Sequence, residues 1–323
     1  MGFLDRFRQL FISEAATAVT TTPAPDPISP KVMVIIHNPT VRSQGGKKLS
    51  QVLRWQDPDQ LAANYLRDVR EASYGYVNYQ IAERVEVDGC PVKADGFVYD
   101  GEGYYQRWYT RTGWHQPDRV DYGRILDEFQ IIPRINLGQI DEVWLFGFPY
   151  AGYYESMMVG PGAFWCNAPG MEYGRCRRKF VIMGFNYERG VGEMLENLGH
   201  RVESIMSHVF RHKRGGRNLW ERFTRYDKIA PGRAECGNVH FAPNSERDYD
   251  WGNPRPVPSR CDTWYHFPDL SGPPRQVNCT EWGSGDIRLH HLWWLRHLPH
   301  VAGSSGGISH NWWEYVINPN QVK

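Results

Sequence analysis

A stretch shortly after residue 190 places three carboxylates and one imidazole on a single helical face. The four side chains are spaced by three or four residues, so in an α-helix they project within about 80° of one another. Such a face can ligate a metal ion, as helical-bundle metal sites do. A solvated, ion-paired face and a buried structural network are the alternatives, and the first is favoured because the stripe lies opposite the apolar side of the same helix. The stripe consists of Glu193, Glu196, His200 and Glu203, of which Glu196 and His200 are the predicted metal ligands.

Several glutamates have surroundings that suit acid–base catalysis. Glu281 directly precedes Trp282, and an apolar neighbour raises the pKa of a carboxyl group, as a general acid requires. Glu188 and Glu193 lie at a predicted helix start, where free N–H groups favour negative charge. Helix capping and an exposed loop position are the alternative roles for these side chains. The predicted catalytic carboxylates are Glu155, Glu188, Glu193 and Glu281.

Aromatic residues are abundant, with 13 Trp, 18 Tyr and 14 Phe, and many stand beside glycine or asparagine. Flat aromatic faces next to hydrogen-bonding groups suit sugar rings and other amphipathic ligands. Filling of the hydrophobic core is the alternative role for these rings. The predicted substrate-binding residues are Asn38, Tyr154, Trp165, Asn186, Arg189 and Trp282.

Three functions fit these candidates. The leading hypothesis is a hydrolase of a carbohydrate or glycan-like substrate, in which two carboxyls flank the glycosidic bond. The first alternative is a metal-dependent hydrolase that uses the acidic stripe and a histidine from near the C-terminus. The second is a non-catalytic ligand-binding or assembly protein that docks through an N-terminal helix. The histidines near the C-terminus are His290, His291, His297, His300 and His310, and no cofactor can be named.

These side chains need elements that bring them together, and the pattern predicts an α/β fold. Apolar runs near residues 32–36, 140–146 and 180–183 predict three central strands, and polar residues follow each of them. Because ligands bind beyond the carboxyl ends of parallel strands, the three following loops are expected to converge. The fold class is an open, mainly parallel sheet with flanking helices and long aromatic-rich, Gly/Pro-rich loops. Helices are expected near 58–75, 121–129, 190–208 and 286–298, an edge strand at 76–87, a strand or loop at 97–109, and a short ordered stretch at 311–317.

The chain divides into an N-terminal extension and one folded body. Residues 1–30 combine a short amphipathic helix with an Ala-, Thr- and Pro-rich linker, which cannot bury enough surface to order itself. Residues 3–12 are therefore expected to contact a protein partner or a membrane surface. Residues 31–323 form a single globular domain, whose C-terminal part is irregular from about residue 212.

Composition and the absence of known motifs disfavour several functional classes of protein. The net charge is only +1, so no global field recruits nucleic acid, and no apolar run is long enough to span a membrane. P-loop, dinucleotide-binding, GxSxG and HExxH motifs do not occur. The six cysteines form no CxxC pair, and their even number favours an oxidising compartment, with Cys166 and Cys176 as the expected disulfide. An extracellular or cell-surface location is expected, although no clear signal peptide precedes the domain.

Overall fold

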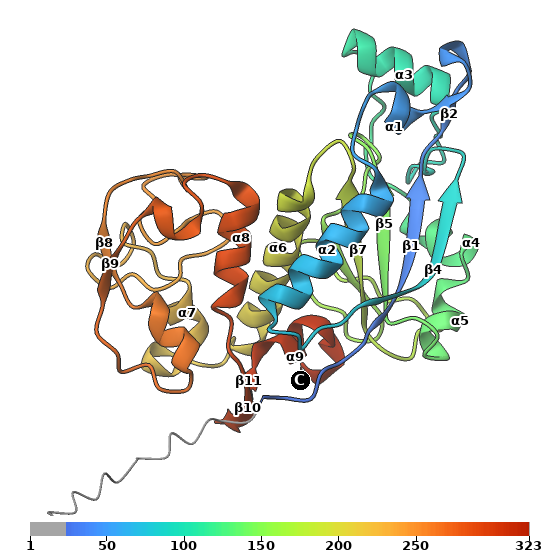
Figure 1. Ribbon diagram of the computed structural model, residues 1–323. Coiled ribbons are helices and arrows are strands. Elements are labelled where there is room, and N and C mark those ends of the chain that lie inside the picture. Colours follow the sequence, from blue (N-terminus) through green and yellow to red (C-terminus); the bar gives the residue numbers. More distant parts are fainter. Residues whose placement is uncertain (1–23, 323) are drawn as a thin grey trace, which may run out of the picture.

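The computed structural model describes residues 24–322, and its centre is a five-stranded sheet (Figure 1). The strand order is β4-β1-β5-β7-β6, in which the first four strands are parallel and β6 runs antiparallel to β7. This confirms the expected open, mainly parallel α/β sheet. The strands are β1 (Lys31–His37), β4 (Gln80–Val87), β5 (Glu142–Gly147), β6 (Ser156–Val159) and β7 (Phe180–Asn186).

Helices cover both faces of the sheet because its central strands are apolar on both sides. In β1, Val34 belongs to one core cluster and the next residue, Ile35, to the other, as the alternation of side chains along a strand requires. The first face packs against α2 (Pro58–Ala72) and α6 (Val191–Val209), and the second against α4 (Tyr122–Glu128) and α5 (Ile131–Asn136). All but α5 of these helices were predicted from the sequence.

One predicted element is wrong. The aromatic, glycine-rich stretch at 97–109 was expected to form a strand or loop, but it contains the helix α3 (Gly101–Thr110). The side chain of Asp100 accepts a hydrogen bond from Gly103 N and caps the first turn. Aromatic content favours strands, and here the N-cap outweighs that preference.

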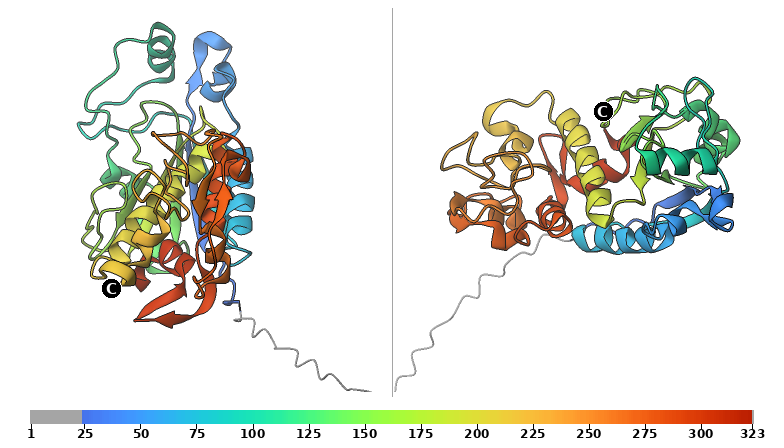
Figure 2. Two further views of the ribbon diagram at one scale, coloured as in Figure 1. Left: turned by 90° about the vertical axis from the view of Figure 1, so that its left-hand side faces the viewer. Right: turned by 90° about the horizontal axis from the view of Figure 1, so that it is seen from above.

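Most of the segment after α6 packs on the side of that helix away from the sheet (Figures 1 and 2), whereas its C-terminal end returns to the sheet, where Asn320 accepts a hydrogen bond from Lys179 N just before β7. Its helix α8 lies along α6, and α9 also contacts α6. No helix among the described residues is both long and apolar enough to cross a bilayer. The other elements are α1 (Leu49–Val52), α7 (Leu219–Phe223), α8 (Ile287–Arg296), α9 (Trp312–Ile317), β2 (Thr40–Val41), β3 (Lys47–Lys48), β8 (Val257–Ser259), β9 (Arg275–Val277), β10 (His300–Ser305) and β11 (Ile308–Asn311).

The expected disulfide between Cys166 and Cys176 is not formed. All six cysteines lie within the described residues and are free thiols. Cys166 is buried beside Ser156, whereas the Cys176 thiol donates a hydrogen bond to the carbonyl of Arg178 at 3.0 Å. The cysteines therefore give no support to an oxidising compartment. The amphipathic helix expected at residues 3–12 lies outside the described residues, so its docking role stays a prediction.

A buried ion pair joins α6 to the sheet and to the C-terminal helix. Arg201 is completely buried, and its guanidinium lies 2.8 Å from Glu142 on β5 and donates to the carbonyl of Val316 on α9. Tyr79 and Trp144 donate to the same carboxylate, at 2.9 and 2.8 Å. Every oxygen of this buried charge therefore has a partner.

Replacing Arg201 by methionine is expected to lower the free energy of unfolding by about 3–5 kcal/mol, because Glu142 would remain buried without its counter-charge. Urea denaturation near pH 7.5 measures the difference. Arg247→Met is the matched control, since the Arg247 side chain is 84% exposed and pairs only loosely with Asp250. A loss below about 1 kcal/mol for Arg201→Met would contradict the importance of this pair.

Candidate metal centre and adjoining cavity

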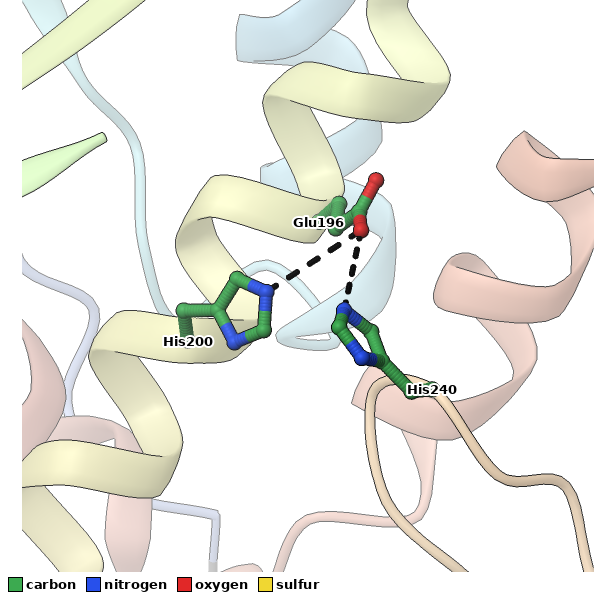
Figure 3. Close-up of side chains that lie close together, drawn as sticks. All are labelled: Glu196, His200 and His240. Carbon is green, nitrogen blue, oxygen red and sulfur yellow. Dashed lines mark hydrogen bonds and ion pairs between the residues drawn. The ribbon is translucent and has the colours of Figure 1, made fainter. Parts of the chain in front are cut away.

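Glu196 and His200 lie one turn apart on α6, and both side chains face His240 (Figure 3). Their carboxylate Oε1 and ring Nε2 atoms are 4.0 Å apart. Glu196 is only 7% exposed, so this part of the acidic stripe is not the solvated face that helical periodicity allowed. A loop formed by residues 237–250 covers it.

The covering loop brings His240 to the same point. Asn238 accepts hydrogen bonds from His240 N and Phe241 N through its side-chain oxygen, which shapes the turn. Gly199 lets the loop approach α6 closely, because a Cβ there would lie 2.5 Å from Val239 Cγ2. As a result, His240 Nε2 lies 3.1 Å from Glu196 Oε1 (Figure 3).

A carboxylate contacts the Nδ1 atom of each imidazole, on the side of the ring remote from Glu196. His200 Nδ1 is 3.1 Å from Glu203 Oε2, and His240 Nδ1 is 3.1 Å from Asp248 Oδ1. The second oxygen of Glu203 accepts a hydrogen bond from Val239 N at 3.1 Å, so one side chain fixes both the ring and the loop. Carboxylates on the remote nitrogens of paired histidines are typical of metal sites, where they fix ring orientation and raise ligand basicity.

The geometry of the three side chains fits a small divalent cation. One ligand atom each from Glu196, His200 and His240 lies within 4.8 Å of the other two. In a tetrahedral zinc site with bonds of about 2.0–2.2 Å, ligand atoms stand roughly 3.4 Å apart. The measured separations of 3.1 and 4.0 Å fall on either side of that value.

Two further polar groups border this centre. The hydroxyl of Tyr249 lies 3.0 Å from Glu196 Oε1 and 3.1 Å from His240 Nε2. On the other side, Glu155 Oε2 lies 3.9 Å from His200 Nε2 and accepts a hydrogen bond from the side chain of Asn167. The cluster therefore holds more carboxylates than imidazoles, which favours a cation.

Protonation within the cluster reflects this charge balance. The hydrogen bond to Glu196 raises the pKa of His240. Burial opposes the charge of His200, but the hydrogen bond to Glu203 and the surrounding carboxylates raise its pKa overall. Burial likewise opposes the charge of Glu196, yet the hydrogen bond from His240 and the neighbouring histidines lower its pKa. Burial and the hydrogen bond to Glu196 raise the pKa of Tyr249 to about 12, so its hydroxyl keeps its proton near neutral pH.

A cavity of about 250 Å³ adjoins the cluster at the carboxyl ends of β5 and β7, beside the start of α6. Four of the predicted site residues line it: Glu155, Asn186, Arg189 and Glu193. Glu155 therefore belongs both to the cavity and to the histidine cluster. Glu193 also accepts a hydrogen bond from Gly190 N, so it caps its own helix while it faces the cavity.

The structure places the other predicted carboxylates elsewhere. Both oxygens of Glu281 accept hydrogen bonds from the guanidinium of Arg275, at 2.7 and 2.9 Å. Its neighbour Trp282 is 1% exposed and donates to the carbonyl of Trp251, so the ring is part of the core. Glu188 does not line the cavity, and its carboxylate lies 3.8 Å from Arg189.

Three predicted substrate-binding residues also lie away from this cavity. Asn38 is buried and donates a hydrogen bond to Ser50 at 3.0 Å. Tyr154 lines a separate cavity of about 350 Å³ and stacks parallel to Tyr122. Trp165 is 61% exposed. Aromatic type and loop position were the only signals for these residues, and neither fixes where a side chain points.

Sequence reasoning missed His240, Asp248 and Tyr249. They lie in a turn-rich segment with no periodic pattern, and the predicted histidine ligand was instead assigned to the denser group after residue 286. A histidine, an aspartate and a tyrosine within ten consecutive residues, 240–249, were the available signal. Comparison with protein-family models finds no match for the chain, and searches of curated proteins and of solved structures find none either.

Proposed function

We propose that this chain is a metal-dependent hydrolase whose metal ion is held by Glu196, His200 and His240. The observation that carries the proposal is the convergence of their ligand atoms within 4.8 Å of one another. In addition, a carboxylate contacts the Nδ1 atom of each histidine. Two imidazoles and one carboxylate form the protein ligand set of several catalytic zinc sites, which leave the fourth position to water or substrate.

The neighbouring side chains suit hydrolysis. Zinc at this centre would supply a Lewis acid that polarises a carbonyl or phosphoryl group and lowers the pKa of water. Glu155 suits the role of general base, because its carboxylate lies 3.9 Å from His200 Nε2 and also lines the cavity. Tyr249 suits the stabilisation of a developing oxyanion, because its protonated hydroxyl lies 3.1 Å from His240 Nε2.

Zinc loading tests the proposal directly. Chelator-treated protein and zinc-loaded protein are compared on a panel of peptides, esters, phosphoesters and glycans, and bound zinc is counted by elemental analysis. Hydrolysis that requires zinc, together with the loss of about one zinc per chain in Glu196→Gln, is the expected result. Equal zinc content in the wild type and in Glu196→Gln would refute the assignment of this centre.

The carboxylates behind the histidines should tune the affinity for the metal. Glu203→Gln is expected to weaken zinc binding about 10–100-fold, because His200 would lose the negatively charged acceptor that orients its ring and raises its basicity. Competition with a fluorescent zinc indicator measures the change. Glu221→Gln serves as the control, since Glu221 lies on α7 outside the cluster. A Glu203→Gln variant that binds zinc as tightly as the wild type would contradict this second layer of contacts.

A glycan hydrolase without metal is the second candidate, because Glu155 and Glu193 line the same cavity. Two carboxyls on either side of a glycosidic bond can divide the acid and base or nucleophile roles. Glu193→Gln separates the two candidates. It would abolish glycan cleavage by a carboxylate pair, whereas zinc-dependent hydrolysis would change only a few-fold, since Glu193 is not a ligand of the centre.

A further inference from the structure

A second group of metal-ligand side chains lies in the C-terminal half of the chain, apart from the centre described above. Cys261 Sγ, a carboxylate oxygen of Asp262 and a ring nitrogen of His297 lie within 4.8 Å of one another. Cys261 and Asp262 follow β8, and His297 ends α8, so the group joins two segments distant in sequence. Cys261 is fully buried and His297 is 1% exposed.

His297 has a ring nitrogen that the rest of the described chain leaves without a partner. Its Nδ1 lies 2.7 Å from the carbonyl of Trp293 and 3.3 Å from the hydroxyl of Tyr265. Its Nε2 is buried and makes no hydrogen bond within the described residues. A buried polar atom without a partner lowers the stability of the fold by about 1–3 kcal/mol. A ligand bound to Nε2 would remove this cost.

A second buried cysteine, Cys236, belongs to the same region. Ala234 bridges Ser259 in parallel register, and Cys236 and Cys261 each follow two residues later. Both cysteines are fully buried, and the charge of Cys261 adds to the burial that raises the pKa of Cys236. Both thiols therefore lie in the buried interior of this region.

Both oxygens of Asp262 accept hydrogen bonds from Arg275, which is itself also paired with Glu281. Arg275 Nη2 donates to Asp262 Oδ1 at 3.0 Å, and the same guanidinium forms two hydrogen bonds with Glu281. Glu281 therefore offsets the charge of Arg275. Asp262 Oδ1 also accepts a weak hydrogen bond from the Cys261 thiol at 3.5 Å, so thiol and carboxylate already face each other.

We infer that Cys261, Asp262 and His297 form a zinc site. Thiolate and imidazole ligands select zinc over magnesium and calcium. Zinc would replace the thiol proton of Cys261, since a thiol that coordinates the cation is deprotonated. The ion would tie together two segments of a region with little regular secondary structure, as structural zinc sites do in small loop-rich domains.

Cobalt substitution of the full-length wild-type protein tests this site without any mutation. Of the two centres found in residues 24–322, this one alone has a sulfur ligand, so a thiolate-to-cobalt charge-transfer band distinguishes it from the first. The band is expected to appear on cobalt loading, to vanish in Cys261→Ser, and to persist in His200→Ala, which alters only the first centre. A folded wild-type protein that gives no thiolate band would overturn the inference.

Zinc counts give a second, independent readout. Cys261→Ser and His297→Gln should each bind about one zinc fewer than the wild type and melt several degrees lower. Cys279→Ser is the matched control, because it changes another buried thiol of the same region. Full zinc content in both ligand variants would overturn the site, whereas loss of zinc only in His200→Ala would refute this inference and leave the proposed function standing.

Discussion

The protein is expected to lose much of its stability as the pH falls from about 6.5 to about 4. His37 and His291 are buried, and burial lowers the pKa of each to about 4. Burial also lowers the pKa of His290 well below its usual value. The unfolded chain takes up protons at these positions near pH 6.5, whereas the folded protein excludes them until about pH 4. The free energy of unfolding therefore falls with pH across this window, and the contribution is fully present only above it.

The expected loss of unfolding free energy is large compared with the total stability of an ordinary domain. A shift from 6.5 to about 4 corresponds to about 3 kcal/mol for each histidine, so His37 and His291 together approach the 5–15 kcal/mol of a typical domain. His200 and His240 act in the opposite direction, because their pKa values are raised and their contribution is lost as the pH rises. Urea denaturation at pH 7.5, 6.5, 5.5 and 4.5 measures the balance.

The substitution His37→Gln tests whether the buried histidines cause this dependence of stability on pH. His37→Gln removes one site at which only the unfolded chain binds a proton between pH 4 and 6.5. The slope of the unfolding free energy against pH in this range should therefore fall by the equivalent of about one proton. His212→Gln, at an exposed position, should leave the slope unchanged. A wild-type protein whose stability is flat across this range would show that the buried histidines do not control it.

The His240→Ala variant is expected to lose zinc from the first centre and at least about 10³-fold in kcat/KM. Changing a residue behind the ligands costs about 10–100-fold in metal affinity or activity, so removal of a ligand should cost more. The substitution leaves α6 and the sheet intact, because His240 belongs to a covering loop. Zinc content and hydrolysis of the substrate identified by screening are measured on the same preparation.

His208→Ala provides the comparison for this experiment. His208 lies near the end of α6 and stacks on Phe164, outside the cluster. It should retain zinc and activity within a few-fold. If His240→Ala kept full activity with a normal zinc content, the chain would not use this centre for catalysis. Lost activity with retained zinc would instead assign His240 to substrate contact.

Elements with regular apolar periodicity were predictable, because their patterns are local. The run from Val32 to Ile36 gave β1, and Asp57 with Pro58 gave the start of α2. The stretch at 97–109 was mispredicted, since a single cap at Asp100 decides a helix that its composition does not favour. The short strand β6 and the helix α5 carried too few periodic residues to be found.

The sequence by itself determined that Glu196 and His200 share one face of a long helix, because a period of 3.6 residues is a property of the backbone. Only the tertiary structure decided that this face is covered rather than solvated, and that His240 meets it. That contact joins residues about forty positions apart through a close approach at Gly199 and a turn at Asn238. Such a contact depends on how loops pack on a completed core, and no local pattern of residue types encodes that packing.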